Sequence, residues 1–233
     1  MIRFAVAVLF AALNLVPLYG IQHWNWDAFQ LLIIYWTETL ILAGWAMVRI
    51  ALLPEDRLGT MTVNGKVKPA TRRMMVGFFS LHAGMFIAVH LLFLCLLFSG
   101  DWFKRLTGVG DFFKTFYVTS GGWMVVLAAL VIGGVEALTA KVPPPPAPGK
   151  KPTTDAAPAF TMTSGSGKKE EVTSVSSGDA VGTIVGTLYG RIVIMQVAII
   201  FGAWAANSYG STAPLVIVIA LKTLWDFGTR IAR

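Results

Sequence analysis

The sequence predicts an all-α integral membrane protein, a bundle of about six transmembrane helices. Of the 233 residues, 55% are hydrophobic and only 13% are charged, and the mean hydropathy is +0.67. Soluble domains carry about 25% charged residues, so this balance excludes an ordinary soluble fold. The apolar residues also form runs of about 20, the length that crosses a bilayer as a helix, and the basic residues lie between these runs.

Apolar stretches mark the expected spans in chain order. They cover residues 3–20, 28–53, 74–99, 118–139, 182–206 and 213–228. The first is short, like a signal peptide, but no small-residue cleavage site follows it. Because Trp24 and Trp26 follow it as an interfacial belt, we expect a retained helix. The last is also short, and it contains Lys222 and Asp226.

Basic residues orient the predicted bundle. They concentrate at the chain ends and in two loops, at residues 49–73 and 141–169. The opposite side holds only Lys104, Arg105 and Lys114, within an aromatic segment at 101–117 that we expect on the outer membrane surface. Loops rich in Lys and Arg stay in the cytoplasm. We therefore expect a protein of the cell inner membrane with both termini in the cytoplasm, N-in and C-in.

Composition divides the chain into membrane segments and a linker. Residues 1–140 carry the first four spans and residues 181–233 the last two, which we expect to pack together as one membrane domain. Residues 141–180 begin with the run Pro143–Pro146 and continue with Ser, Thr, Gly and Lys. Such a composition buries too little apolar surface to fold, which predicts a disordered cytoplasmic linker. The single cysteine, Cys95, excludes a disulfide framework.

Ionisable side chains inside the predicted spans are the candidate binding residues, because charge in a bilayer is costly and rare. They are Glu38, His82, His90, Arg191, Lys222 and Asp226. At the rise of an α-helix, Glu38, Arg191 and Lys222 each lie roughly 14–15 Å from a helix end, near mid-bilayer. Lys222 and Asp226 are four residues apart and can meet on one helix face. Glu38 and Arg191 then form a candidate pair between helices.

Two interpretations of this cluster stay open. The charges form an ion-pair network that fixes helix packing, or they line a polar cavity that binds an anionic group or passes protons. The histidine spacing argues against a metal site. His82 and His90 point about 80° apart and are separated by about 12 Å along one helix, and no other span contains a histidine. We predict no metal and no cofactor.

Several short motifs resemble a known family. They are residues 14–20, Tyr35-Trp36-Thr37-Glu38, residues 79–90, Tyr189-Gly190-Arg191-Ile192 and residues 221–226. The chain resembles bacterial multi-span membrane proteins catalogued only as a domain of unknown function. The resemblance implies a shared membrane fold with a polar core, formed here by Glu38, His82, His90, Arg191, Lys222 and Asp226, but it implies no reaction. The family often has a histidine five residues after the Arg, where this chain has Gln196, and we include Gln196 among the candidate binding residues.

Three classes of function stay open. The first is binding or transport of a small molecule, a lipid or protons at the polar cluster. The second is a structural or assembly subunit of a larger membrane complex, in which the charges are a scaffold. The third is a membrane enzyme without a local motif, since Ser80 and His82 point away from each other on a helix. The expected partners are the bilayer and other membrane proteins or a second copy of the chain. Nucleic acid is not expected, because the net charge of +7 lies mainly in loops between spans.

Overall fold

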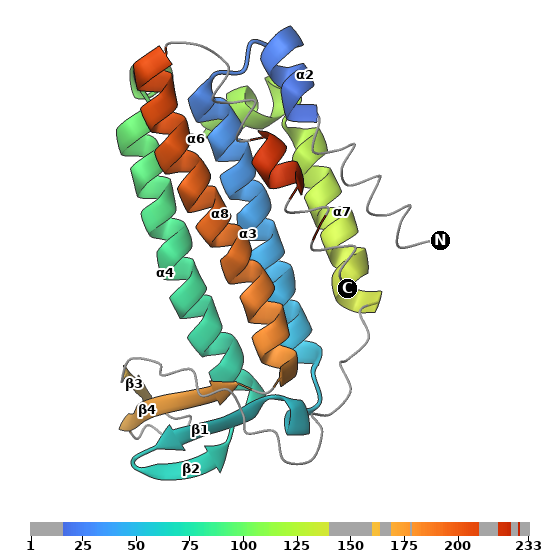
Figure 1. Ribbon diagram of the computed structural model, residues 1–233, viewed down its shortest axis with the longest axis vertical. Helices are drawn as coiled ribbons and strands as arrows, with labels where there is room; N and C mark the ends of the chain where they lie inside the picture. Colours follow the sequence, from blue (N-terminus) through green and yellow to red (C-terminus); the bar gives the residue numbers. More distant parts are fainter. Residues whose placement is uncertain are drawn as a thin grey trace. The chain divides into compact units, whose positions relative to one another are not determined.

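The structure is a computed structural model that describes residues 16–139, 160–163, 169–177, 179–209, 219–224 and 228. The described part is mostly helical (Figure 1). Its contacts divide the chain into two compact units. The first unit comprises residues 1–43, 85–135 and 189–233, and the second comprises residues 44–84 and 136–188. The long helices contribute residues to both units.

The helices differ greatly in length. The long ones are α3 (Ala28–Leu52), α4 (Arg72–Phe98) and α8 (Asp179–Tyr209), followed by α7 (Trp123–Thr139). The short ones are α2 (Val16–His23), α5 (Trp102–Arg105), α6 (Val109–Phe113), the 3-10 turn η1 (Glu55–Arg57) and the π-helical turn η2 (Lys114–Thr119). Residues 219–224 are also helical.

Helices α3 and α4 are long and apolar enough to cross a membrane. Over a stretch of 18 residues in each, the mean hydropathy is 1.7 in α3 and 2.3 in α4. They occupy the second and third expected spans. Val109–Thr119 and Trp123–Thr139 together make a third candidate, although the chain bends by 80° between them. The first and sixth expected spans lie largely outside the described residues, so the number six stays a prediction.

The expected fourth span, residues 118–139, is not one straight helix. Gly121 has a φ of +74°, a conformation that costs little only for glycine. A Cβ on Gly122 would lie 2.5 Å from the carbonyl oxygen of Phe116. The Ser120 hydroxyl donates to the same carbonyl at 2.5 Å, and the Trp26 indole donates to the Ser120 carbonyl at 3.0 Å. Residues 120–122 read Ser-Gly-Gly inside the expected span, and these bonds and the two glycines break the helix there.

Helix α3 is central to the first unit. It supplies residues to two buried clusters. One contains Trp26, Leu31, Ile34, Tyr35, Val125 and Ile219, and the other contains Phe29, Leu32, Ile33, Leu94 and Phe116. Asp27 caps the helix, since its Oδ1 accepts from the backbone N–H of Gln30 at 2.8 Å. These contacts hold α3 against α4, α7, η2 and residues 219–224.

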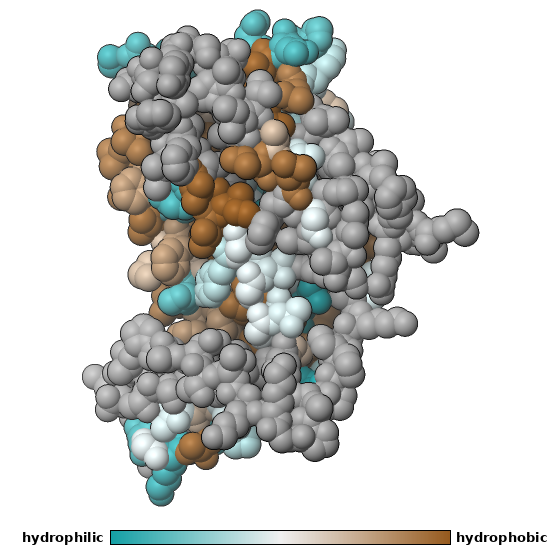
Figure 2. Space-filling model, in the orientation of Figure 1, coloured by the Kyte–Doolittle hydropathy of each residue, from teal (hydrophilic) through white to brown (hydrophobic). Residues whose placement is uncertain are grey.

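Helix α4 is more exposed than α3. Within the apolar stretch of 18 residues in each helix, half of α3 is buried, compared with 22% of α4. Along α4, large apolar side chains that are more than half exposed include Leu81, Met85, Leu92 and Leu96. Figure 2 shows hydrophobic residues at the side of the molecule where α4 runs in Figure 1. A continuous apolar face of this kind is unfavourable in water and is typical of a helix in contact with lipid or another protein.

The second unit contains an antiparallel sheet that the sequence analysis did not predict. Its strands are β1 (Gly59–Val63), β2 (Lys66–Pro69), β3 (Phe160–Thr163) and β4 (Lys169–Ser177), in the order β2-β1-β4-β3 (Figure 1). Asn64 and Gly65, both with positive φ, form the two-residue turn between β1 and β2. Met61 and Val63 alternate with exposed or half-buried neighbours, as a strand buried on one face requires.

Part of the predicted linker forms strands β3 and β4. They lie within residues 141–180, for which the composition predicts disorder. In the structure Val175 pairs with Met61, and Val172 pairs with Val63. This pairing with a distant segment stabilises a strand whose own composition is polar. Residues 140–159 lie outside the described part of the chain.

Candidate functional site

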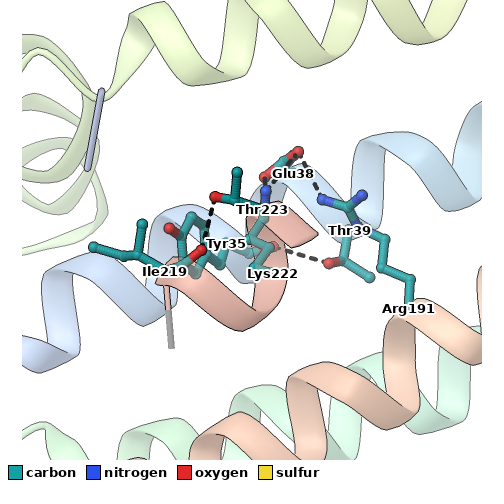
Figure 3. A network of polar contacts seen from close by, with 7 residues as sticks. All are labelled: Tyr35, Glu38, Thr39, Arg191, Ile219, Lys222 and Thr223. Atoms are coloured by element: carbon teal, nitrogen blue, oxygen red, sulfur yellow. Dashed lines mark hydrogen bonds and ion pairs between the residues drawn. The ribbon is translucent and has the colours of Figure 1, made fainter. Parts of the chain in front are cut away.

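Three charged side chains meet inside the first unit (Figure 3). Glu38 comes from α3, Arg191 from α8 and Lys222 from the helical residues 219–224. Their exposed fractions are only 3%, 8% and 5%, in that order. Nη2 of Arg191 lies 2.6 Å from Oε1 of Glu38, and Nζ of Lys222 lies 3.0 Å from Oε2. One carboxylate therefore joins three segments that are far apart in the sequence.

Each member of this charged cluster, Glu38, Arg191 and Lys222, has a close partner of opposite charge. Nζ of Lys222 lies 3.4 Å from Oε1 of Glu38 and 4.8 Å from the centre of the Tyr35 ring. Moving an ion from water into the protein interior costs roughly several kcal/mol of desolvation free energy. A close partner of opposite charge offsets this cost. Arg191 and Lys222 share the carboxylate of Glu38, so its loss weakens the pairing of both cations. The cluster therefore links α3 to α8 and to residues 219–224.

Hydroxyl groups near the charged cluster bond to their own helices (Figure 3). Thr39 donates to the carbonyl of Tyr35 at 2.9 Å, and Thr223 donates to the carbonyl of Ile219 at 2.7 Å. Such bonds to the preceding turn satisfy a hydroxyl in an apolar helix. The hydroxyls of both threonines are therefore hydrogen-bonded without Glu38 as a partner.

An apolar cavity of about 900 Å³ lies in the same unit, between α3, α4 and the segment from α5 to α7. Its volume falls within the range of roughly 300–1,000 Å³ that is usual for small-molecule sites. Its aromatic wall consists of Trp36, Phe103, Phe112, Phe113, Tyr117 and Trp123. Phe103, Phe113 and Trp123 are at least half exposed, so the cavity opens to the surroundings of the helices.

Both hydroxyl groups of the cavity wall and the indole N–H of Trp36 are hydrogen-bonded to the protein. Thr37 donates its only hydroxyl proton to the Ile33 carbonyl at 2.9 Å, so the bond of 2.6 Å to Tyr117 has Tyr117 as its donor. The indole of Trp36 donates to the Ile87 carbonyl at 2.8 Å. The wall therefore offers mainly hydrocarbon and ring faces to a ligand.

Comparison with known proteins identifies the family. The model of a family of unknown function, DUF6498, matches residues 2–139 and 170–233. The chain belongs to this family. No curated protein and no solved structure matches the chain. The DUF6498 match contains the charged cluster and the whole cavity wall, and it leaves out residues 140–169. Membership of DUF6498 assigns no activity, so a function must be argued from the geometry.

Within the DUF6498 fold, the structure brings together part of the predicted set. The expected pair of Glu38 and Arg191 is present, and Lys222 joins it. Asp226 lies outside the described residues, so its pairing with Lys222 stays a prediction. Gln196 on α8 is half-buried.

The two histidines lie apart from each other. His82 belongs to the second unit, is half-buried and stacks on Phe78 with ring centres 5.6 Å apart. His90 belongs to the first unit and is buried, and its Nε2 makes no hydrogen bond to the described residues. Across the described residues, no group of three or more His, Cys, Asp or Glu side chains is arranged to hold a metal ion.

The cavity was not predicted from the sequence. None of the charged or histidine candidates contributes to its wall. The signal that points to it is the aromatic segment at 101–117, which we expected on the membrane surface. In the structure Phe103, Phe112, Phe113 and Tyr117 of this segment turn toward α3 and enclose the cavity.

Proposed function

We propose that this DUF6498 protein is a multi-pass membrane protein that binds a small apolar or lipid-like molecule in the aromatic cavity. The observation that carries the proposal is the chemistry of the cavity. It combines a volume of about 900 Å³ with aromatic walls and with hydroxyls that already bond to the protein. Aromatic rings contribute large contact areas to apolar ligands, and a wall with few open polar groups selects hydrocarbon over water.

The membrane setting supports this ligand class. The apolar lengths of α3 and α4 and the exposed apolar face of α4 suit a bilayer. Our proposal includes six spans, both termini in the cytoplasm and the inner membrane of the cell, on the strength of the basic loops. A cavity that opens beside Phe103, Phe113 and Trp123 would then be reached from lipid or from the membrane surface.

The charged cluster supports the cavity instead of forming it. Glu38 directly follows Trp36 and Thr37, which line the cavity, and precedes Leu40, which also lines it. Consecutive helical residues point about 100° apart. The ion pairs of Glu38 with Arg191 and Lys222 therefore fix the rotation of α3, and this rotation presents Trp36, Thr37 and Leu40 to the cavity.

A second candidate function is a structural or assembly subunit of a larger membrane complex. The paired state of Glu38 and the apolar face of α4 favour it. In that case a partner protein covers α4, the charges serve only as a scaffold, and the cavity holds no specific ligand. The two functions differ in whether the cavity wall binds a molecule in a saturable way.

A photoreactive fatty acid with a diazirine in its chain is a suitable probe. We expect saturable labelling of the aromatic wall in the purified full-length protein, with peptides containing Phe103, Phe112 and Tyr117 modified. Leu91→Trp fills the cavity and should abolish this labelling. Leu92→Trp is the matched control, because Leu92 is the next residue on α4 and is 56% exposed outside the wall. Non-saturable labelling along α4 that ignores Leu91→Trp would favour the assembly subunit.

A further inference from the structure

The β1–β2 hairpin of the second unit is held at the ends of two apolar helices. Strand β2 ends at Pro69 and α4 begins at Arg72, a gap that can span no more than about 10 Å. The Arg72 guanidinium donates to the Leu53 carbonyl just after α3, at 3.2 Å. The N–H of Ala70 donates to the Gly59 carbonyl at 3.0 Å and closes the base of the hairpin. If α3 and α4 enter a bilayer, the hairpin lies at its surface.

Positive charge accumulates on this hairpin. From residue 55 to residue 73 the chain has five basic and two acidic residues, a net charge of +3. One acid, Asp56, pairs with Arg57 at 3.4 Å. The other basic residues, all exposed, are Lys66, Lys68, Arg72 and Arg73. The aromatic segment at 101–117 has three basic and two acidic residues, a net charge of only +1, and Lys104 pairs with Asp101 at 2.7 Å.

Two lysines of β2 lie on the same face of the sheet because of the register of the hairpin. Lys66 pairs with Val63 and Lys68 pairs with Met61, so both lysines lie on the face of the buried residues of β1. They are nevertheless exposed, because β2 is the edge strand of the sheet. Val67, on the opposite face, is 71% exposed. The edge strand therefore carries two exposed lysines, Lys66 and Lys68, a few residues before the start of α4.

We propose that the basic hairpin, residues 59–69 with Arg72 and Arg73, docks onto the anionic headgroups of the bilayer that α3 and α4 enter. Charge complementarity and the position at the helix ends identify this partner. A basic residue close to an anionic membrane surface raises affinity by a factor of about five. This inference rests on the membrane insertion stated under Proposed function, but not on the ligand of the cavity. Lysines on an edge strand also prevent pairing between sheets, a role that needs no lipid.

Hydrogen exchange of the full-length chain in nanodiscs separates these roles. We expect the amides of β2 to exchange more slowly in discs of phosphatidylcholine and phosphatidylglycerol than in discs of phosphatidylcholine alone. Lys66→Gln with Lys68→Gln should remove the difference and weaken binding of a short-chain phosphatidylglycerol by about 25-fold. Lys66→Arg with Lys68→Arg should preserve both effects.

The matched control removes the same charge elsewhere. Lys104→Gln with Lys114→Gln takes two exposed cations from the first unit and should leave exchange at β2 unchanged. Equal exchange of β2 in both kinds of disc, or the same loss in the control, would overturn the proposal. Equal protection by heparin in discs of phosphatidylcholine alone would overturn it in favour of a soluble polyanion. Failure of membrane insertion is distinguishable, because the chain would then be released from membranes by alkaline carbonate.

Discussion

Replacement of Glu38 by Gln should cost more stability than replacement of either of its partners. The carboxylate lies 2.6 Å from Arg191 and 3.0 Å from Lys222, and all three side chains are more than nine-tenths buried. Removing one member of a buried ion pair costs about 3–5 kcal/mol, because the other charge is left without compensation. Glu38→Gln removes a carboxylate that two buried cations share. We expect a loss at or above the upper end of this range.

The partners should respond less strongly. Arg191→Gln leaves Glu38 with Lys222, so we expect a smaller loss than for Glu38→Gln. In the double variant Glu38→Gln with Arg191→Gln, the two losses should not add, with a coupling of roughly 0.5–3 kcal/mol. Recovery should be incomplete, since Lys222 stays buried without Glu38.

The assay is equilibrium unfolding of the purified full-length protein in detergent, followed by tryptophan fluorescence. Glu55→Gln removes an exposed carboxylate and serves as the control, with an expected change within about 0.5 kcal/mol. Glu38→Gln with wild-type stability, or strictly additive losses in the double variant, would refute the view that Glu38 clamps the helices.

Further predictions concern the bend and the cavity wall. Gly122→Ala should destabilise the protein by about 1–3 kcal/mol, because its Cβ would lie 2.5 Å from the Phe116 carbonyl oxygen. Gly110→Ala, with open space around it, is the control in the same thermal unfolding experiment. Tyr117→Phe should cost about 0.5–1.5 kcal/mol through the lost bond to Thr37. The same variant should keep its fatty-acid labelling, and a loss of labelling would mean that the ligand needs the Tyr117 hydroxyl.

The long helices and one ion pair were predictable from the sequence. α3 and α4 were predictable because each contains an apolar run long enough to cross a bilayer, and such a run is visible in consecutive residues. The pair of Glu38 and Arg191 follows from matching depth in two spans. The bond of Lys222 to Glu38 was not predicted, because depth alone does not decide which of several cations reaches a carboxylate.

Other features depend on contacts between distant segments. The sheet joins residues near 60 to residues near 175, and the polar composition of β4 gives no sign of this pairing. The bend depends on the close approach of Gly122 to Phe116, a contact that the order of residues does not show. A cavity is a space between elements, so a sequence shows its aromatic residues but not that they enclose a volume.

The most direct test of the central claim is an experimental structure of the full-length protein in lipid nanodiscs. We predict elongated density inside the cavity lined by Thr37, Phe103, Phe113 and Tyr117, with no protein side chain to account for it. A cavity collapsed by repacking of these rings, with well-resolved surroundings and no density inside, would contradict the claim that this protein binds an apolar molecule there.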